Sequence, residues 1–208
     1  MPCGRTPPVR GTFDGAAAMR GRGHIWTRRL GVEALILLVA AAAFSSPAAA
    51  ANSHCAHASA VPAHLSTDDA GHALRCLING VRRQHHLRAV RASRSLGLAA
   101  RRHADDMAGH DYFAHDSPGG STMESRIRRS GYLRRGREWW LGEALAWGKA
   151  RFGAPQAILR SLLASPPHRA ILLDPGFRDL GIGVARGAPR GAGGGALTIA
   201  LDFGRVRR

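Results

Sequence analysis

Apolar residues recur at helical spacing in the middle of the chain. Thr67, followed by two aspartates, is typical of a helix N-cap, and apolar positions after it at i, i+3, i+4 and i+7 predict a helix that ends near Gln84. A second helix is expected to begin near Ser95, because one face of the following stretch collects Leu, Ala, His and Met residues. Both segments therefore present an apolar side to a core and a polar side to solvent.

Two further helices are expected later in the chain. Residues 121–124, Ser-Thr-Met-Glu, indicate a capping box that opens a short helix, and Gly131 is of the residue type that ends helices. Pro155 suits the first position of another helix with one apolar side. Pro166 and Pro167 are expected to break that helix, and a short turn follows them.

Near the end of the chain the pattern becomes that of strands. Residues 180–184 alternate apolar residues with glycine, and residues 196–203 are rich in strand-forming residues. The glycine-rich stretch between them predicts an antiparallel hairpin with a long loop, and residues 139–147 are a third strand candidate. Helices that precede the strands indicate an α+β fold, in which helices cover a small antiparallel sheet.

The first fifty residues have a different pattern. Arg28 and Arg29 precede an eleven-residue apolar run, Ala34–Phe44, and small residues follow it. These features are typical of a secretory signal peptide, whereas a membrane-crossing helix usually needs about 18 apolar residues. We interpret residues 1–51 as signal peptide and leader. A buried core helix and an uncleaved N-terminal anchor are the alternatives.

Export of the chain would make the protein secreted, extracellular or held in the cell envelope, with residues 52–75 leading into the first helix. Cys3 would be lost with the leader, and Cys55 and Cys76 would remain in an oxidising compartment. We therefore predict one disulfide bond between Cys55 and Cys76. Two free thiols, or a lipid attached to Cys55, are the alternatives.

The amino-acid composition gives the chain a strong net positive charge. The chain contains 30 Lys and Arg residues against 14 Asp and Glu residues, a formal net charge of +16, and the part from Asn52 onward keeps a net charge of +12. A secreted protein this basic is expected to adhere to anionic polymers or lipids of the cell envelope, but we favour the interpretation that the scattered basic pairs are solvated helix faces. Aromatic residues do not interleave the basic clusters, which argues against a specific nucleic-acid partner.

Two histidines and one glutamate are candidate functional residues. His115 follows the second predicted helix, Glu143 lies in an apolar, strand-like stretch, and His168 lies where prolines break the fourth helix. A buried carboxylate without partners is costly, so Glu143 is expected to face a cavity, a cation or backbone donors. Two histidines and a carboxylate are an adequate ligand set for zinc with one open position for water, although a lone loop histidine is more often a packing residue.

A series of short motifs follows the order found in a known family. These motifs are Leu77-Ile78-Asn79, His103 with Asp106-Met107, Tyr112-Phe113-Ala114-His115, Gly131-Tyr132, Gly142-Glu143, Ser165-Pro166-Pro167-His168-Arg169, Gly181-Ile182-Gly183 and Asp202-Phe203-Gly204. Through them the chain resembles the CAP superfamily of cysteine-rich secretory, antigen 5 and pathogenesis-related proteins (SCP-like), in its secreted bacterial branch. The resemblance implies an α-β-α sandwich over residues 76–205, with a central antiparallel sheet between helical layers. It also implies a cleft lined by His115, Glu143 and His168 that in some members binds a divalent metal such as zinc.

Departures from the family pattern bear on that metal. The family sequence Gly-Glu-Asn is Gly142-Glu143-Ala144 here, and the Trp-Thr-Gln before the final Phe-Gly is Ile199-Ala200-Leu201. The second cleft glutamate of eukaryotic members has no good match. We therefore expect metal binding weaker than in a closed four-ligand site.

Three functions are compatible with the sequence. We favour a non-catalytic extracellular binding module for a small apolar, lipid-like or anionic ligand. The second is a metal-dependent, protease-like hydrolase, in which His115 and His168 hold zinc and Glu143 is a ligand or the base that activates water. The third is a structural or stress-resistance protein of the envelope. Because one fold supports many functions, the resemblance does not choose among them.

Overall fold

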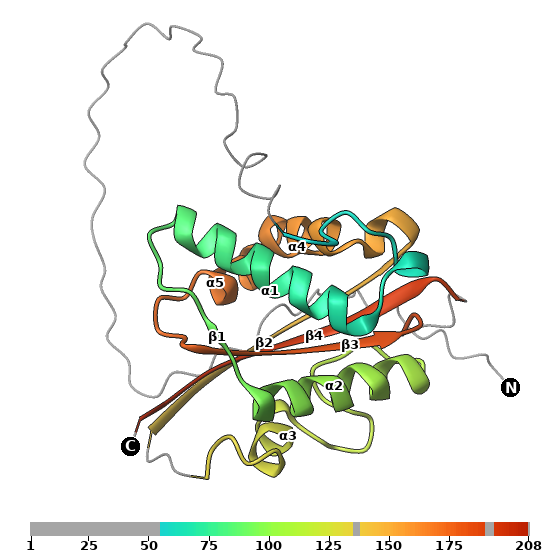
Figure 1. The fold of residues 1–208 in the computed structure, drawn as a ribbon. Helices are drawn as coiled ribbons and strands as arrows, with labels where there is room; N and C mark the ends of the chain where they lie inside the picture. Colours follow the sequence, from blue (N-terminus) through green and yellow to red (C-terminus); the bar gives the residue numbers. More distant parts are fainter. Residues whose placement is uncertain (1–54, 135–137, 190–193, 208) are drawn as a thin grey trace, which may run out of the picture.

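The computed structural model describes residues 55–134, 138–189 and 194–207, and the predicted signal peptide lies outside this part of the chain. Figure 1 shows the elements that the described residues form. They are the α-helices α1 (Thr67–Gln84), α2 (Arg94–Gly109), α3 (Met123–Arg129), α4 (Pro155–Ala164) and α5 (Pro166–Leu172), the 3-10 helices η2 (Pro62–His64) and η3 (Ala150–Gly153), and the strands β1 (Arg91–Ala92), β2 (Glu138–Lys149), β3 (Asp179–Arg186) and β4 (Ala196–Arg207). Of the helices in these described residues, none combines the length and the apolar character that crossing a membrane requires.

The strands form one sheet in the order β1-β3-β4-β2. β3 and β4 pair antiparallel, with Val184 opposite Ile199, so the predicted hairpin is confirmed. β2 pairs antiparallel with the other side of β4. The two-residue strand β1 pairs parallel with β3, which makes the sheet mixed rather than purely antiparallel. A parallel pair needs a long crossover connection, and the elements between these two strands in the sequence are α2, α3, β2, η3, α4 and α5.

Helices cover both faces of the sheet, with α1, α4 and α5 on one face and α2 and α3 on the other (Figure 1). This arrangement confirms the expected α+β sandwich. Side chains of β2 point alternately to the two faces of the sheet. Ala144 and Ala146 pack in the core on the side of α1 and α4. Leu141 and Leu145 pack in the cores on the side of α2 and α3. Glu143 lies midway between Leu141 and Leu145 on the same strand, and it therefore faces α2 and α3.

Two helices begin one residue away from the predicted N-cap. The N-cap of α1 is Ser66, whose hydroxyl accepts a hydrogen bond from the Asp69 N–H at 3.0 Å, and Thr67 is the first helical residue. The N-cap of α3 is Thr122, whose hydroxyl accepts from the Ser125 N–H at 3.2 Å, so the predicted capping box is wrong in its register. At the start of each of these helices, two neighbouring residues have a hydroxyl group that can cap the helix. The path of the preceding loop determines which of the two becomes the N-cap.

The prolines after α4 begin a helix as well as ending one. α4 ends at Ala164, and Pro166 and Pro167 are the first residues of α5, in place of the predicted turn. Proline fits there because the first helical residues have no intrahelical partner for their N–H groups. His168 consequently lies in the first turn of α5.

Two glycines of β3 let α2 approach the sheet closely. A Cβ atom at Gly181 would lie 2.1 Å from the carbonyl carbon of Leu96, and one at Gly183 would lie 2.1 Å from the carbonyl carbon of Ala100. Leu96 and Ala100 are one helical turn apart in α2. The glycines of this strand therefore meet a packing requirement, the contact of helix backbone with strand backbone.

A disulfide bond joins Cys55 to Cys76, as predicted, with their Cα atoms 5.8 Å apart. Cys76 lies in α1, and Cys55 is buried in the core between the sheet and α1. The bond therefore holds the segment that precedes η2 against the first long helix.

Replacing both Cys55 and Cys76 with serine is expected to lower the free energy of unfolding by about 2 to 3 kcal/mol, because the unfolded chain regains the entropy of an open loop. Urea denaturation followed by circular dichroism measures this difference. Wild-type protein treated with a reductant is the matched control and is expected to show the same loss. A double variant as stable as the oxidised wild type would contradict this role of the bond.

Candidate functional site

Glu143 lies at the centre of a buried polar cluster on the α2 and α3 side of the sheet. Its side chain is fully buried. Its Oε1 accepts a hydrogen bond from Nδ1 of His115 at 2.8 Å, and its Oε2 accepts one from the guanidinium of Arg126 at 2.7 Å. We call Glu143, His115, Arg126, His103 and Asp202 the Glu143 cluster.

Arg126 connects the cluster to the loop between α2 and α3. Besides Glu143, it donates hydrogen bonds to the carbonyl oxygens of Ser121 at 2.7 Å and of His115 at 2.8 Å. Arg126 was not among the predicted site residues, because α3 contains three arginines of the same type. Only the rotation of the helix, which buries Met123 and Ile127 on the same side, turns this arginine inward.

His103 reaches the cluster from α2. Its ring is fully buried, with Nε2 donating to the carbonyl oxygen of Ala114 at 3.0 Å and lying 4.0 Å from Oε2 of Glu143. Burial is the main cause that lowers the pKa of His103, so its imidazole is neutral at pH 7. Arg126 therefore supplies the positive charge that balances Glu143.

Asp202 is a second carboxyl group beside Glu143. It lies opposite Glu143 on β4 and is fully buried, and no donor group among the described residues reaches either of its oxygens. Burial and the negative charge of Glu143 raise the pKa of Asp202 well above its usual range, which favours the protonated form. Asp202 was also not predicted, although a carboxylate within an apolar run is the signal that singled out Glu143.

The two carboxyl groups thus differ in their protonation. Burial opposes the ionisation of Glu143, but the hydrogen bond from His115 and the charge of Arg126 outweigh it, and the pKa of Glu143 lies below its usual value. With Glu143 ionised and Asp202 protonated, the cluster avoids two negative charges in one buried place. The hydrogen bond from His115, together with the charge of Arg126, favours Glu143 as the acid that ionises.

His168 lies outside this hydrogen-bond network. Its Nδ1 is 2.9 Å from the hydroxyl oxygen of Ser165, and no hydrogen bond joins it to Glu143 in the described part of the chain. Burial and the charge of His115 lower the pKa of His168. Of the three predicted site residues, the structure joins His115 to Glu143 directly and connects His168 to them only through the electrostatic effect of His115.

The Glu143 cluster does not fit a resident divalent metal. Both oxygens of Glu143 already accept hydrogen bonds, and the permanent charge of Arg126 repels a second cation. Within residues 55–134, 138–189 and 194–207, no three His, Cys, Asp or Glu side chains are arranged to hold a metal ion. The predicted zinc ligands His115, Glu143 and His168 stay a prediction, one that this arrangement disfavours.

Comparisons of the sequence with known proteins agree with the architecture. The profile of the CAP family, the cysteine-rich secretory protein family, matches residues 76–200. A search of curated proteins finds no significant match.

Solved structures provide two similar proteins. An extracellular protein of Bacillus anthracis that contains an SCP domain is 25% identical, with a TM-score of 0.53, and the match covers 69% of this chain and 44% of that one. An outer surface protein of Borrelia burgdorferi is 18% identical, with a TM-score of 0.57, and the match covers 69% of this chain and 97% of that one. The match thus spans less than half the length of the Bacillus protein, and the Borrelia protein is similar in fold alone.

Proposed function

This chain belongs to the cysteine-rich secretory protein (CAP) family, and on that premise we propose that it is an extracellular, non-catalytic binding module for an anionic ligand. Export is supported by the predicted signal peptide, by the disulfide between Cys55 and Cys76, and by the similarity to the extracellular Bacillus anthracis protein.

The observation that carries the non-catalytic assignment is the engagement of both oxygens of Glu143. A general base needs a free lone pair directed at water or substrate, and a pKa near the working pH. Glu143 is fully buried, each of its oxygens accepts a hydrogen bond from His115 or Arg126, and its pKa lies below the usual value. Glu143 is therefore suited to be a buried structural anion and is a poor base.

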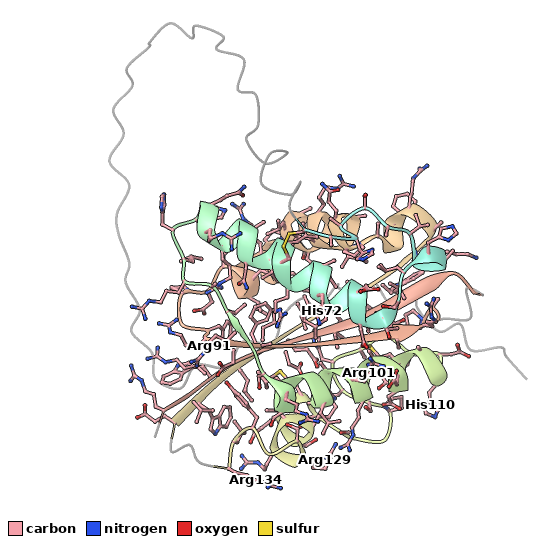
Figure 2. The ribbon with its side chains drawn as sticks, viewed as in Figure 1. His72, Arg91, Arg101, His110, Arg129 and Arg134 are labelled. Atoms are coloured by element: carbon pink, nitrogen blue, oxygen red, sulfur yellow. A yellow bond between two sulfur atoms is a disulfide. The ribbon has the colours of Figure 1, made fainter. Side chains whose placement is uncertain are left out.

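The surface charge supports an anionic ligand. From Asn52 onward the chain carries 24 Arg and Lys residues against 12 Asp and Glu residues. Arg129 and Arg134 are exposed in the layer of α2 and α3, as Figure 2 shows. Such exposed charges attract polyanions, and salt weakens the attraction.

Two assays on the purified protein distinguish zinc-dependent hydrolysis from anion binding. We expect no zinc-dependent cleavage of casein, and the same zinc titration curve for the wild type and for His168→Ala. We expect the protein to bind vesicles that contain phosphatidylglycerol, to release them at about 0.5 M sodium chloride, and not to bind vesicles of phosphatidylcholine alone.

The outcomes distinguish the three functions. Casein cleavage that requires zinc and is lost in folded His168→Ala would overturn the proposal in favour of a metal-dependent hydrolase. Absence of cleavage, together with absence of binding to anions both in vesicles and in solution, would overturn it in favour of an envelope protein without a ligand.

A further inference from the structure

A pocket of about 630 Å³ opens on the layer of α2 and α3, beside the Glu143 cluster. The second half of α2, the loop after it and α3 form its walls, and Figure 2 shows His110 at the end of α2 and Arg129 in the same layer. The buried side chains of His103 and Arg126 also border it. This volume is in the range of small-molecule sites and exceeds what a bare inorganic anion needs.

Asp106, the one acid among the described residues that border the pocket, already has its partners. Its Oδ2 accepts hydrogen bonds from the hydroxyls of Tyr112 and Ser117, and its Oδ1 lies 2.9 Å from Nδ1 of His110. Burial acts against ionisation, but these donors outweigh it and lower the pKa of Asp106. Asp106 is therefore ionised, and both of its oxygens are engaged by donors of the pocket wall.

Two arginines bring uncompensated positive charge to the same pocket. Arg102 comes from α2 and Arg129 from α3, and both are exposed. Neither forms an ion pair with a carboxylate in the described part of the chain. Arg129 donates one hydrogen bond to the hydroxyl of Ser121, which leaves further N–H groups of its guanidinium for a ligand.

The neighbouring arginines on the same helices are different. Arg101 pairs with Asp68 at 3.2 Å, and Arg128 pairs with Glu124 at 2.5 Å. Neither of them borders the pocket. Since Arg126 is paired with Glu143, the unpaired positive charge of the pocket thus belongs to Arg102 and Arg129 and not to the basic helices in general.

Two guanidinium groups at one pocket suit a phosphate group. The planar fork of arginine matches phosphate oxygens, and two fixed positive charges balance a phosphate monoester, whose charge approaches −2 at neutral pH. A carboxylate would balance only one of them. Ala99 and Pro118 also border the pocket and offer apolar contact to the carbon part of an ester.

We propose that this pocket binds the phosphate group of a small phosphate ester, with Arg102 and Arg129 as the residues that contact the anion. The proposal rests on the anion-binding function proposed above, and it gives that function a site and a ligand class. A soluble polyol phosphate and the headgroup of phosphatidic acid both carry a phosphate monoester.

Isothermal titration with glycerol 3-phosphate tests the soluble source, and vesicles that contain phosphatidic acid test the lipid source. The test variant is Arg102→Gln/Arg129→Gln. The matched control, Arg101→Gln/Arg128→Gln, removes the same charge from adjacent positions of α2 and α3. We expect the test variant to lose affinity for glycerol 3-phosphate by about tenfold or more, because charge-assisted hydrogen bonds are lost, and the control to change by less than about twofold.

Each other outcome has a definite meaning. If the soluble ester does not bind but vesicle binding falls only in the test variant, the pocket is confirmed with the headgroup as its source. If the two variants lose binding equally, the pocket proposal is wrong, whereas charge-driven anion binding stands. If wild-type protein binds neither the ester nor the vesicles, both proposals are wrong.

Discussion

Replacing Arg126 with methionine is expected to lower the free energy of unfolding by about 3 to 5 kcal/mol at pH 7, because Glu143 is left as a buried charge without its cation. The side chains of Arg126 and Glu143 are 6% and 0% exposed, so water does not replace the lost partner. Methionine keeps much of the length of arginine and removes the charge. Urea denaturation followed by circular dichroism measures the change.

This loss is expected to be smaller at pH 4 than at pH 7. In the wild type the pKa of Glu143 is lower in the folded than in the unfolded chain. Its stabilising contribution is therefore complete above the unfolded pKa of about 4.3 and is lost as the pH falls through the folded value. In the variant, protonation of Glu143 in mild acid removes the unpaired charge. An equal loss at both pH values would contradict the assignment.

Two further variants separate the ion pair from a general effect of α3. Arg128 is exposed and pairs with Glu124, so Arg128→Met is expected to cost at most about 0.5 kcal/mol. The double variant Arg126→Met/Glu143→Leu is expected to recover most of the loss, because apolar side chains replace both charges. If the double variant were no more stable than Arg126→Met, the loss would not come from the unpaired carboxylate.

Replacing Gly183 with alanine is expected to lower the free energy of unfolding by about 3 kcal/mol or more, because its Cβ would lie 2.1 Å from the carbonyl carbon of Ala100. The obstacle is helix backbone and not the end of a flexible side chain, so α2 must move away from the sheet. That movement also disturbs the packing of the core between α2 and the sheet. Thermal and urea denaturation measure the loss.

Two other alanine variants serve as tests of this close approach. Gly97 lies in α2, and a Cβ atom there meets nothing within 4 Å, so Gly97→Ala is expected to stabilise the protein by about 0.5 to 1 kcal/mol. Gly181→Ala is expected to cost about as much as Gly183→Ala. The double variant is expected to cost less than the sum, since one displacement of α2 accommodates both methyl groups. A neutral Gly183→Ala would show that the helix does not require this contact.

Local patterns along the chain were sufficient to identify most of the secondary structure. The apolar periodicity of α1 and α2 and the alternation in β3 follow from helix and strand geometry, which acts over a few residues. The disulfide followed from the number of cysteines left after export. The sequence did not decide whether Ser66 or Thr67 is the N-cap, because that choice depends on how the preceding loop approaches the helix.

The candidate site was only partly predictable. The cost of burying a carboxylate drew attention to Glu143, and a histidine in the turn after the second predicted helix drew attention to His115, which is hydrogen-bonded to Glu143 at 2.8 Å. Arg126 and Asp202 escaped prediction. Arg126 is one of three arginines in α3, and Asp202 becomes a neighbour of Glu143 only through the register of β2 and β4.

The sequence by itself determined the α+β class, the disulfide and the presence of a buried acid in a basic, CAP-like chain. The tertiary structure alone decided that Arg126 faces Glu143, that Asp202 is the acid whose protonated form is favoured, and that Arg102 and Arg129 border one pocket. The physical reason is that charge interactions depend on the distances between side chains and on their burial. Helix rotation and strand register set both quantities for residues that are far apart in the chain.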